Sequence, residues 1–137
     1  SLQRPGMPLL MVGAVGIGWA YSLPPSRLSC RGHGEILQGV GCGVLLPLTG
    51  FYTQVGSLES FPWMAWVPLF LIFYVGNIIT ALPDYPADLA GNKRTYPVRL
   101  GQRRSREHIL ALLFCGFILI SWVTPNLTNP VSLFLLF

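Results

Sequence analysis

The sequence predicts an all-α protein, a bundle of transmembrane helices with four complete spans and the start of a fifth. Of its 137 residues, 52% are hydrophobic and only 10% are charged, whereas soluble domains carry charge on roughly a quarter of their residues. The mean hydropathy is +0.55. The charged residues are confined to connections between long uncharged stretches, which is typical of a chain that crosses a bilayer.

Four uncharged stretches define the spans, because a helix needs roughly 20 apolar residues to cross about 30 Å of hydrocarbon. Lipid offers no partner for backbone polar groups, so each span is expected to be helical. The predicted helices cover residues 7–23, 36–56, 62–82 and 108–124. A turn-rich sequence then interrupts the last stretch, and residues 131–137 begin the predicted fifth span. Pro47 and Pro68 fall inside two of the spans and predict kinks.

The basic residues indicate the orientation of the bundle. Alternate connections share one side of the membrane, and eight of the nine Lys and Arg residues lie in the first and third connections. These eight are Arg27, Arg31, Lys93, Arg94, Arg99, Arg103, Arg104 and Arg106. Cytoplasmic connections are enriched in Lys and Arg, so we expect a multi-pass integral membrane protein with both connections in the cytoplasm. The net charge of +4 therefore does not indicate nucleic-acid binding.

Both aspartates of the chain lie in the third connection, four residues apart, so on a helix Asp84 and Asp88 share a face. Mg²⁺ prefers a few carboxylates together with water and substrate phosphate oxygens. Lys93, Arg94 and Arg99 follow, with charges that can neutralise a diphosphate. The pattern predicts that Asp84 and Asp88 bind Mg²⁺ and act in catalysis with Lys93. Arg94 and Arg99 are expected to bind substrate.

Two prolines shape the third connection. Pro83 and Pro86 predict a break in the helix, because proline lacks the backbone N–H of a helix interior. We expect the third span to end near Leu82, Asp84 to cap a short new helix, and Pro86 to lie in its first turn. A plainer interpretation is also open, in which Asp84 and Asp88 only cap a helix and solvate the connection.

The first connection carries a second polar cluster. Tyr21 and Arg27 flank a Pro-Pro pair that ends the first span. Because the first and third connections share a side of the membrane, we expect Tyr21 and Arg27 to bind the same substrate. The alternative is an aromatic side chain at the membrane interface and an anchoring cation. Glu35 is expected to place a negative charge at the start of the second span.

Three stretches carry a family resemblance: residues 21–28 (YSLPPSRL), 31–35 (RGHGE) and 83–101 (PDYPADLAGNKRTYPVRLG). They resemble the UbiA superfamily of intramembrane prenyltransferases. The third stretch is the most specific, since it is similar to that superfamily's second aspartate-rich motif, D-x3-D followed by G-K-x-T and V-R-L-G. The chain departs from the pattern by an inserted Asn92, and Arg27 stands where the superfamily has Lys.

The resemblance implies transfer of a polyprenyl group from its diphosphate to an aromatic acceptor, inside a bundle of about nine helices. It implies that Asp84 and Asp88 hold the Mg²⁺ that takes up the charge of the departing diphosphate. Lys93 and Arg99 are implied to add positive charge there. The closest branch prenylates quinone precursors such as dihydroxynaphthoate, as in menaquinone biosynthesis.

The superfamily's first aspartate-rich motif is absent from the sequence. The chain has no third aspartate, so half of the implied metal site is missing. We therefore expect residues 1–137 to form a single partial domain, the C-terminal portion of a longer protein. Missing N-terminal helices of the same protein are expected to supply the rest, and the chain alone is expected to be inactive.

Two other classes of protein compete with this interpretation. A non-enzymatic helix bundle, such as a transporter segment or a scaffold, would use Asp84 and Asp88 only as caps. Against it, the two polar clusters share one side, and the complete spans contain no acidic or basic side chain of the kind that transporters often bury. Membrane alcohol phosphotransferases carry patterns resembling D-x2-D-G-x2-A-R, which this sequence lacks.

Overall fold

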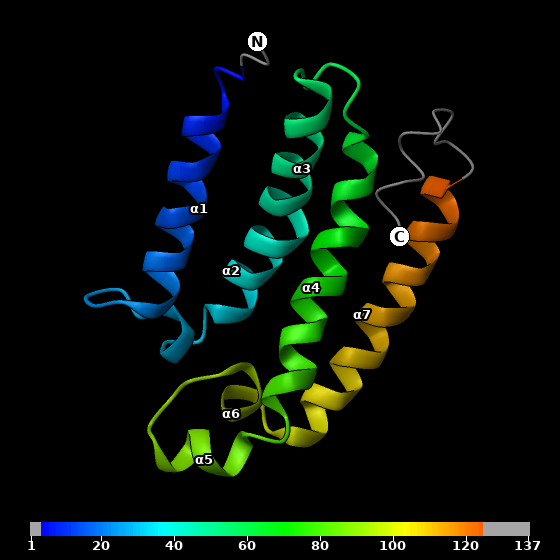
Figure 1. Ribbon diagram of the computed structural model, residues 1–137. Helices are drawn as coiled ribbons and strands as arrows, with labels where there is room; N and C mark the ends of the chain where they lie inside the picture. The colour runs from blue at the N-terminus through cyan, green and yellow to red at the C-terminus, as the bar shows by residue number, and fades with distance from the viewer. Residues whose placement is uncertain (1–3, 125–137) are drawn as a thin grey trace.

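The computed structural model describes residues 4–124, and all regular secondary structure within that range is helical. Long helical segments lie side by side, and the short helices α5 and α6 lie at one end of them (Figure 1). The helices are α1 (Met7–Ser22), α2 (Gly34–Val40), α3 (Leu46–Val55), α4 (Trp66–Ala81), α5 (Tyr85–Ala90), α6 (Tyr96–Leu100) and α7 (Gln102–Val123), with the single turns η1 (Leu28–Cys30), η2 (Gly41–Leu45) and η3 (Trp63–Ala65). The predicted all-α transmembrane class is confirmed.

Three segments are long and apolar enough to cross a bilayer. They are Gly34–Val55, which joins α2, η2 and α3, then Trp63–Ala81, which joins η3 and α4, and finally α7. The helix α1 is apolar but has only 16 residues, about 24 Å at the rise of an α-helix. Four complete spans therefore remain a prediction, and the fifth, at residues 131–137, lies outside the described residues.

The two prolines inside predicted spans behave differently. Pro47 has no N–H to donate into the preceding turn, and the chain runs through the π-helical turn η2 directly before the helix that contains it. The predicted place of Pro68 in the interior of a helix is wrong. Because α4 begins at Trp66, Pro68 lies in the first turn, where the missing N–H leaves no helical bond unmade.

The helix α4 occupies the centre of the packing, with α2 and η2 on one side and α7 on the other. Val75, Ile78 and Ile109 form a buried cluster between α4 and α7. Gly43 lets η2 approach α4 closely, because a Cβ there would lie 2.7 Å from Phe70 Cα. Other large apolar side chains, such as Phe117 on α7, are exposed, as expected where lipid takes the place of water.

The third connection follows its prediction at the start and departs from it later. The helix α4 ends at Ala81, Asp84 occupies the N-cap position of α5, and Pro86 lies in the first turn of α5. The predicted break and short helix are confirmed, although Asp84 makes no side-chain capping hydrogen bond. The sequence does not predict α6, whose first residue is Tyr96. The span predicted to start at residue 108 corresponds to α7, which begins six residues earlier, at Gln102.

Candidate functional site

A polar pocket of about 200 Å³ lies where the first and third connections meet. Both connections lie at the same end of the bundle, beside α5 and α6 (Figure 1). Four of the predicted site residues line the pocket: Tyr21 at the end of α1, Asp84 at the N-cap of α5, Asp88 within α5, and Lys93 in the loop after α5. Segments more than 60 residues apart in the sequence thus contribute side chains to one cavity.

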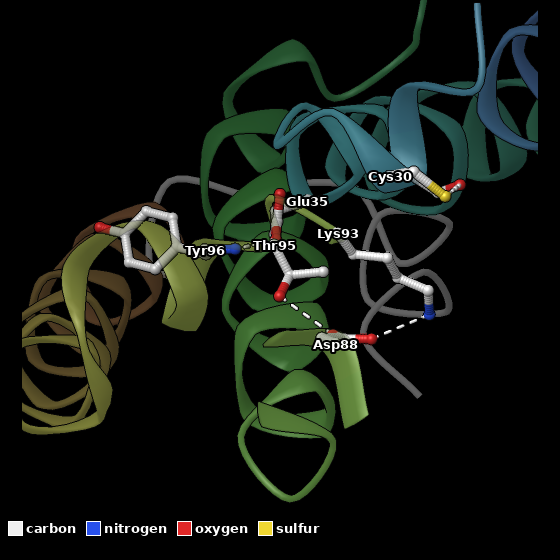
Figure 2. A network of polar contacts seen from close by, with 7 residues as sticks. Cys30, Glu35, Asp88, Lys93, Thr95 and Tyr96 are labelled. Carbon is white, nitrogen blue, oxygen red and sulfur yellow. Dashed lines mark hydrogen bonds and ion pairs between the residues drawn. The ribbon is translucent and has the colours of Figure 1, made fainter. Parts of the chain in front are cut away.

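Asp88 is the fixed carboxylate of the pocket. Its side chain is buried, with 4% of the residue exposed. Lys93 Nζ donates to Asp88 Oδ1 at 2.8 Å and Thr95 Oγ1 donates to Asp88 Oδ2 at 3.0 Å (Figure 2). The backbone N–H of Lys93 also donates to the Asp88 carbonyl at 2.9 Å. Both carboxylate oxygens are therefore oriented by Lys93 and Thr95, which follow Asp88 closely in the sequence.

Lys93 carries a stable positive charge into this pocket. Its hydrogen bond to Asp88, and then the attraction between the two charges, raise the pKa of Lys93 above its usual 10.5. About half of the side chain is exposed, so the ammonium is also accessible from outside the pocket. The group is protonated at neutral pH and suited to binding an anion.

Asp84 is the free carboxylate. It is exposed, and among the described residues its side chain has no hydrogen-bond partner. It lines the same pocket as Asp88, one turn earlier. No group of three or more His, Cys, Asp or Glu side chains in residues 4–124 is placed to hold a metal ion. A divalent cation bound here would need further oxygen ligands from a substrate or from water.

The three predicted arginines do not line this pocket. Arg27 is exposed in the turn before η1, and Arg94 is exposed in the loop before α6. Arg99 has a structural contact, since its Nη1 donates to the carbonyl of Gly32 at 2.9 Å. Gly32 has a φ of +82°, and a Cβ there would lie 2.5 Å from the Arg94 carbonyl oxygen.

The structure also identifies pocket residues that the sequence analysis missed. Glu35 and Thr95 both line the pocket, with 3% and 9% of each residue exposed. Asn77 and Thr80 line it from the last two turns of α4. Asn77 and Thr80 could have been recognised from the sequence, because two polar residues three apart in an apolar span lie on the same face of the helix.

An apolar groove of about 340 Å³ runs beside α1, between it and the segment formed by α2, η2 and α3. Met11, Ile17 and Gly18 line it from α1, and Leu45 lines it from η2. Tyr21 borders both this groove and the polar pocket. The two cavities therefore adjoin at one aromatic side chain, with charged groups on one side and hydrocarbon on the other.

Comparison with known proteins gives a family for the chain. No curated protein and no solved structure matches it. The model of the UbiA prenyltransferase family matches residues 2–137. With three helical segments able to span a bilayer, this match identifies an integral membrane protein with prenyltransferase relatives. The chain belongs to the UbiA prenyltransferase family.

Proposed function

We propose that the protein transfers a polyprenyl group from a polyprenyl diphosphate to an aromatic quinone precursor, such as dihydroxynaphthoate, with Mg²⁺ as its cofactor. Family membership supports prenyl transfer. The observation that carries the proposal is the pocket that joins Asp84, Asp88 and Lys93 to Tyr21. The likeness of residues 21–28 and 31–35 to the quinone branch supports an aromatic acceptor of that type.

The donor set of the pocket fits Mg²⁺. Asp84 offers both carboxylate oxygens, and each oxygen of Asp88 has a lone pair left beside its single hydrogen bond. These are hard oxygen ligands on one wall, which leave room for water and phosphate oxygens. When bound, Mg²⁺ would supply positive charge that stabilises the departing diphosphate.

The residues of the chain perform the remaining steps. Lys93 donates to a diphosphate oxygen as the bond between that group and the first prenyl carbon breaks, and Asp88 keeps its ammonium in place. The electron pair of the bond leaves with the diphosphate. The allylic cation then combines with an aromatic carbon, whose proton passes to the released diphosphate. Tyr21 borders the point where this cation forms, and its ring face can stabilise positive charge.

The apolar groove is suited to the prenyl chain. It adjoins the polar pocket at Tyr21, so a diphosphate bound near Asp84 places its hydrocarbon tail toward α1. Apolar walls also keep water from the allylic cation, which would otherwise be hydrolysed. The chemistry of the two cavities thus corresponds to the two ends of one substrate.

The arginines have different roles in this proposal. Arg27 and Arg94 are exposed at the end of the bundle that carries the pocket, and we assign them to attract the anionic diphosphate. Arg99 joins the two connections through Gly32. Because eight basic residues gather in these connections, we place this end, with the Asp84 loop, on the cytoplasmic side.

The partial metal site belongs to the same proposal. Asp84 and Asp88 are the only aspartates of the sequence, and both lie in this pocket. We propose that N-terminal helices of the same protein carry further acidic ligands and that residues 1–137 alone are inactive. Mg²⁺-dependent prenyl transfer by the isolated 137-residue chain would contradict this.

The decisive experiment substitutes Asp84 or Asp88 by Ala in the full-length protein and follows transfer of a radiolabelled prenyl group in lipid nanodiscs. We expect each variant to lose about a hundredfold or more in kcat/KM, because each removes charge stabilisation at the diphosphate. Glu107→Ala, on the exposed start of α7, is the matched control and retains activity. Unchanged activity in both aspartate variants would favour a non-enzymatic helix bundle.

A further inference from the structure

The first and third connections are held together by three hydrogen bonds. The backbone N–H of Arg94 donates to the Cys30 carbonyl at 2.9 Å, and Arg99 Nη1 donates to the Gly32 carbonyl at 2.9 Å. The third bond is the only one of the three with a carboxylate as acceptor, since the N–H of Tyr96 donates to Glu35 Oε1 at 2.7 Å.

Glu35 supplies the acceptor that the start of α6 lacks from its own residues. Thr95 occupies the N-cap position, where a hydroxyl normally accepts a hydrogen bond from the first turn. Here the Thr95 hydroxyl instead donates to Asp88, and Thr95 makes no side-chain capping bond. Glu35 accepts the N–H of Tyr96, the first residue of α6, which has no acceptor within the helix. Glu35 and Asp88 therefore hold two neighbouring residues, Tyr96 and Thr95 (Figure 2).

We propose that Glu35 is a positioning residue, which fixes the start of α6 and so keeps the Thr95 hydroxyl on Asp88. The proposal rests on the prenyl transfer proposed above. Glu35 is 3% exposed and its bond to Tyr96 is part-buried. A backbone N–H that loses its partner in such a place is costly enough to shift the segment that carries it. If Tyr96 shifts, Thr95 moves with it, and Asp88 loses one of the two partners that orient its carboxylate.

This arrangement predicts an effect on ligand affinity more than on turnover. In full-length protein, Glu35→Ala is expected to raise both the KM for the prenyl diphosphate and the Mg²⁺ concentration for half-maximal activity by about tenfold, with kcat changed less than about threefold. Glu35→Gln keeps a side-chain oxygen that can accept the Tyr96 N–H. It is expected to restore both values to within about threefold of the wild type.

Variants of Thr95 test the route through Asp88. Thr95→Val removes the hydroxyl at constant shape, so it is expected to raise the KM and the Mg²⁺ requirement as Glu35→Ala does. Thr95→Ser keeps the hydroxyl and is expected to leave both quantities near their wild-type values. Because Glu35 acts through Thr95, the variant that combines Glu35→Ala with Thr95→Val is expected to have a KM no higher than that of either single variant. Glu59→Ala, an exposed carboxylate in the connection between α3 and η3, is the control and is expected to match the wild type.

Hydrogen exchange of residues 93–99 gives a second measurement that needs no turnover. Glu35→Ala is expected to speed exchange there, and Glu35→Gln to leave it near wild type. Unchanged exchange, unchanged KM in Glu35→Ala or Thr95→Val, or additive effects in the double variant would each overturn the proposal. If Glu35→Ala does not fold, Thr95→Val and Glu35→Gln decide by the same measures. Full activity in Asp88→Ala would instead overturn the proposed function, whatever Glu35 does.

Discussion

The two ends of the helix bundle combine hydrogen bonds and ring packing differently. At the end away from the polar pocket, the N–H of Gly6 donates to Tyr52 Oη at 2.9 Å, and Arg4 donates to the carbonyls of Thr53 and Gln54. At the end with the polar pocket, hydrogen bonds of 2.7 and 2.9 Å join residues that are 61 and 67 positions apart in the sequence. At the other end, the rings of Phe51, Phe61, Trp63 and Trp66 pack edge to face, with neighbouring centroids 4.6 to 5.6 Å apart. Even the buried Trp66 Nε1 lacks a hydrogen-bond partner among the described residues.

The difference teaches where each kind of interaction is useful. Ring packing joins helix ends over a broad surface and tolerates small displacements. Hydrogen bonds depend steeply on distance and angle, so they fix individual atoms such as the Asp88 oxygens. We therefore expect substitutions in the aromatic cluster to lower stability and substitutions at the polar pocket to lower activity.

The largest effect on stability is expected at Phe61, which is 4% exposed and contacts Phe51, Trp63 and Trp66. Phe61→Ala should lower the free energy of unfolding by about 3 kcal/mol, because it leaves a cavity in the cluster. Thermal unfolding in detergent measures this loss. Phe117→Ala, at a residue that is 69% exposed, should cost much less. The comparison would break if Phe61→Ala lost activity per folded molecule at permissive temperature.

The helical segments were the predictable part of this fold, and the reason is the composition of the spans. A long apolar stretch is enough to predict a membrane-spanning helix. The predicted end of the third span, residue 82, is thus one residue beyond the last residue of α4, Ala81. Proline chemistry likewise predicts the break before α5. The polar start of α7 was missed because the basic residues between Gln102 and residue 108 mark a connection by charge while still forming helix.

The candidate site was predictable only as far as local spacing reaches. Asp84, Asp88 and Lys93 lie within ten residues, and all three line the pocket. The contacts of Glu35 and Arg99 depend on a tertiary approach of two distant connections, which no local pattern specifies. The acceptor and the quinone branch stay predictions, since they rest on sequence likeness alone.

The next largest effect is expected for Lys93→Gln, which tests whether a substitution at the polar pocket lowers activity without lowering stability. Loss of the ammonium should raise the KM for the prenyl diphosphate by about tenfold, with little change in thermal stability. Because Asp88 raises the pKa of Lys93 above 10.5, its charged contact is complete below that pH and is lost only as pH rises through the raised pKa. Wild type and Lys93→Gln should then have pH profiles of one shape between about pH 6 and 9. Profiles that diverge there would contradict the role given to Lys93.

A smaller effect is expected where the polar pocket adjoins the apolar groove. Gly18 lines the groove and Gly16 does not, and a Cβ at either would meet no atom within 4 Å. Gly18→Leu should therefore fold, yet reduce the use of long prenyl diphosphates several-fold more than that of short ones, because its side chain enters the groove. Competition between substrates of two chain lengths measures the ratio. Gly16→Leu is the matched control, and an equal change in both variants would remove the groove from the proposal.

The smallest effect is expected for an ion pair at the same end as the pocket. Arg103 Nε and Glu107 Oε1 are 3.1 Å apart, but their side chains are 93% and 57% exposed. Water screens such a pair, so Arg103→Gln should change the free energy of unfolding by less than about 0.5 kcal/mol and leave prenyl transfer unchanged. Thermal unfolding of this variant and of Glu107→Gln measures both sides of the pair. A loss well above that limit would mean that exposed charge also stabilises the polar end, contrary to the small contribution expected of an ion pair that water screens.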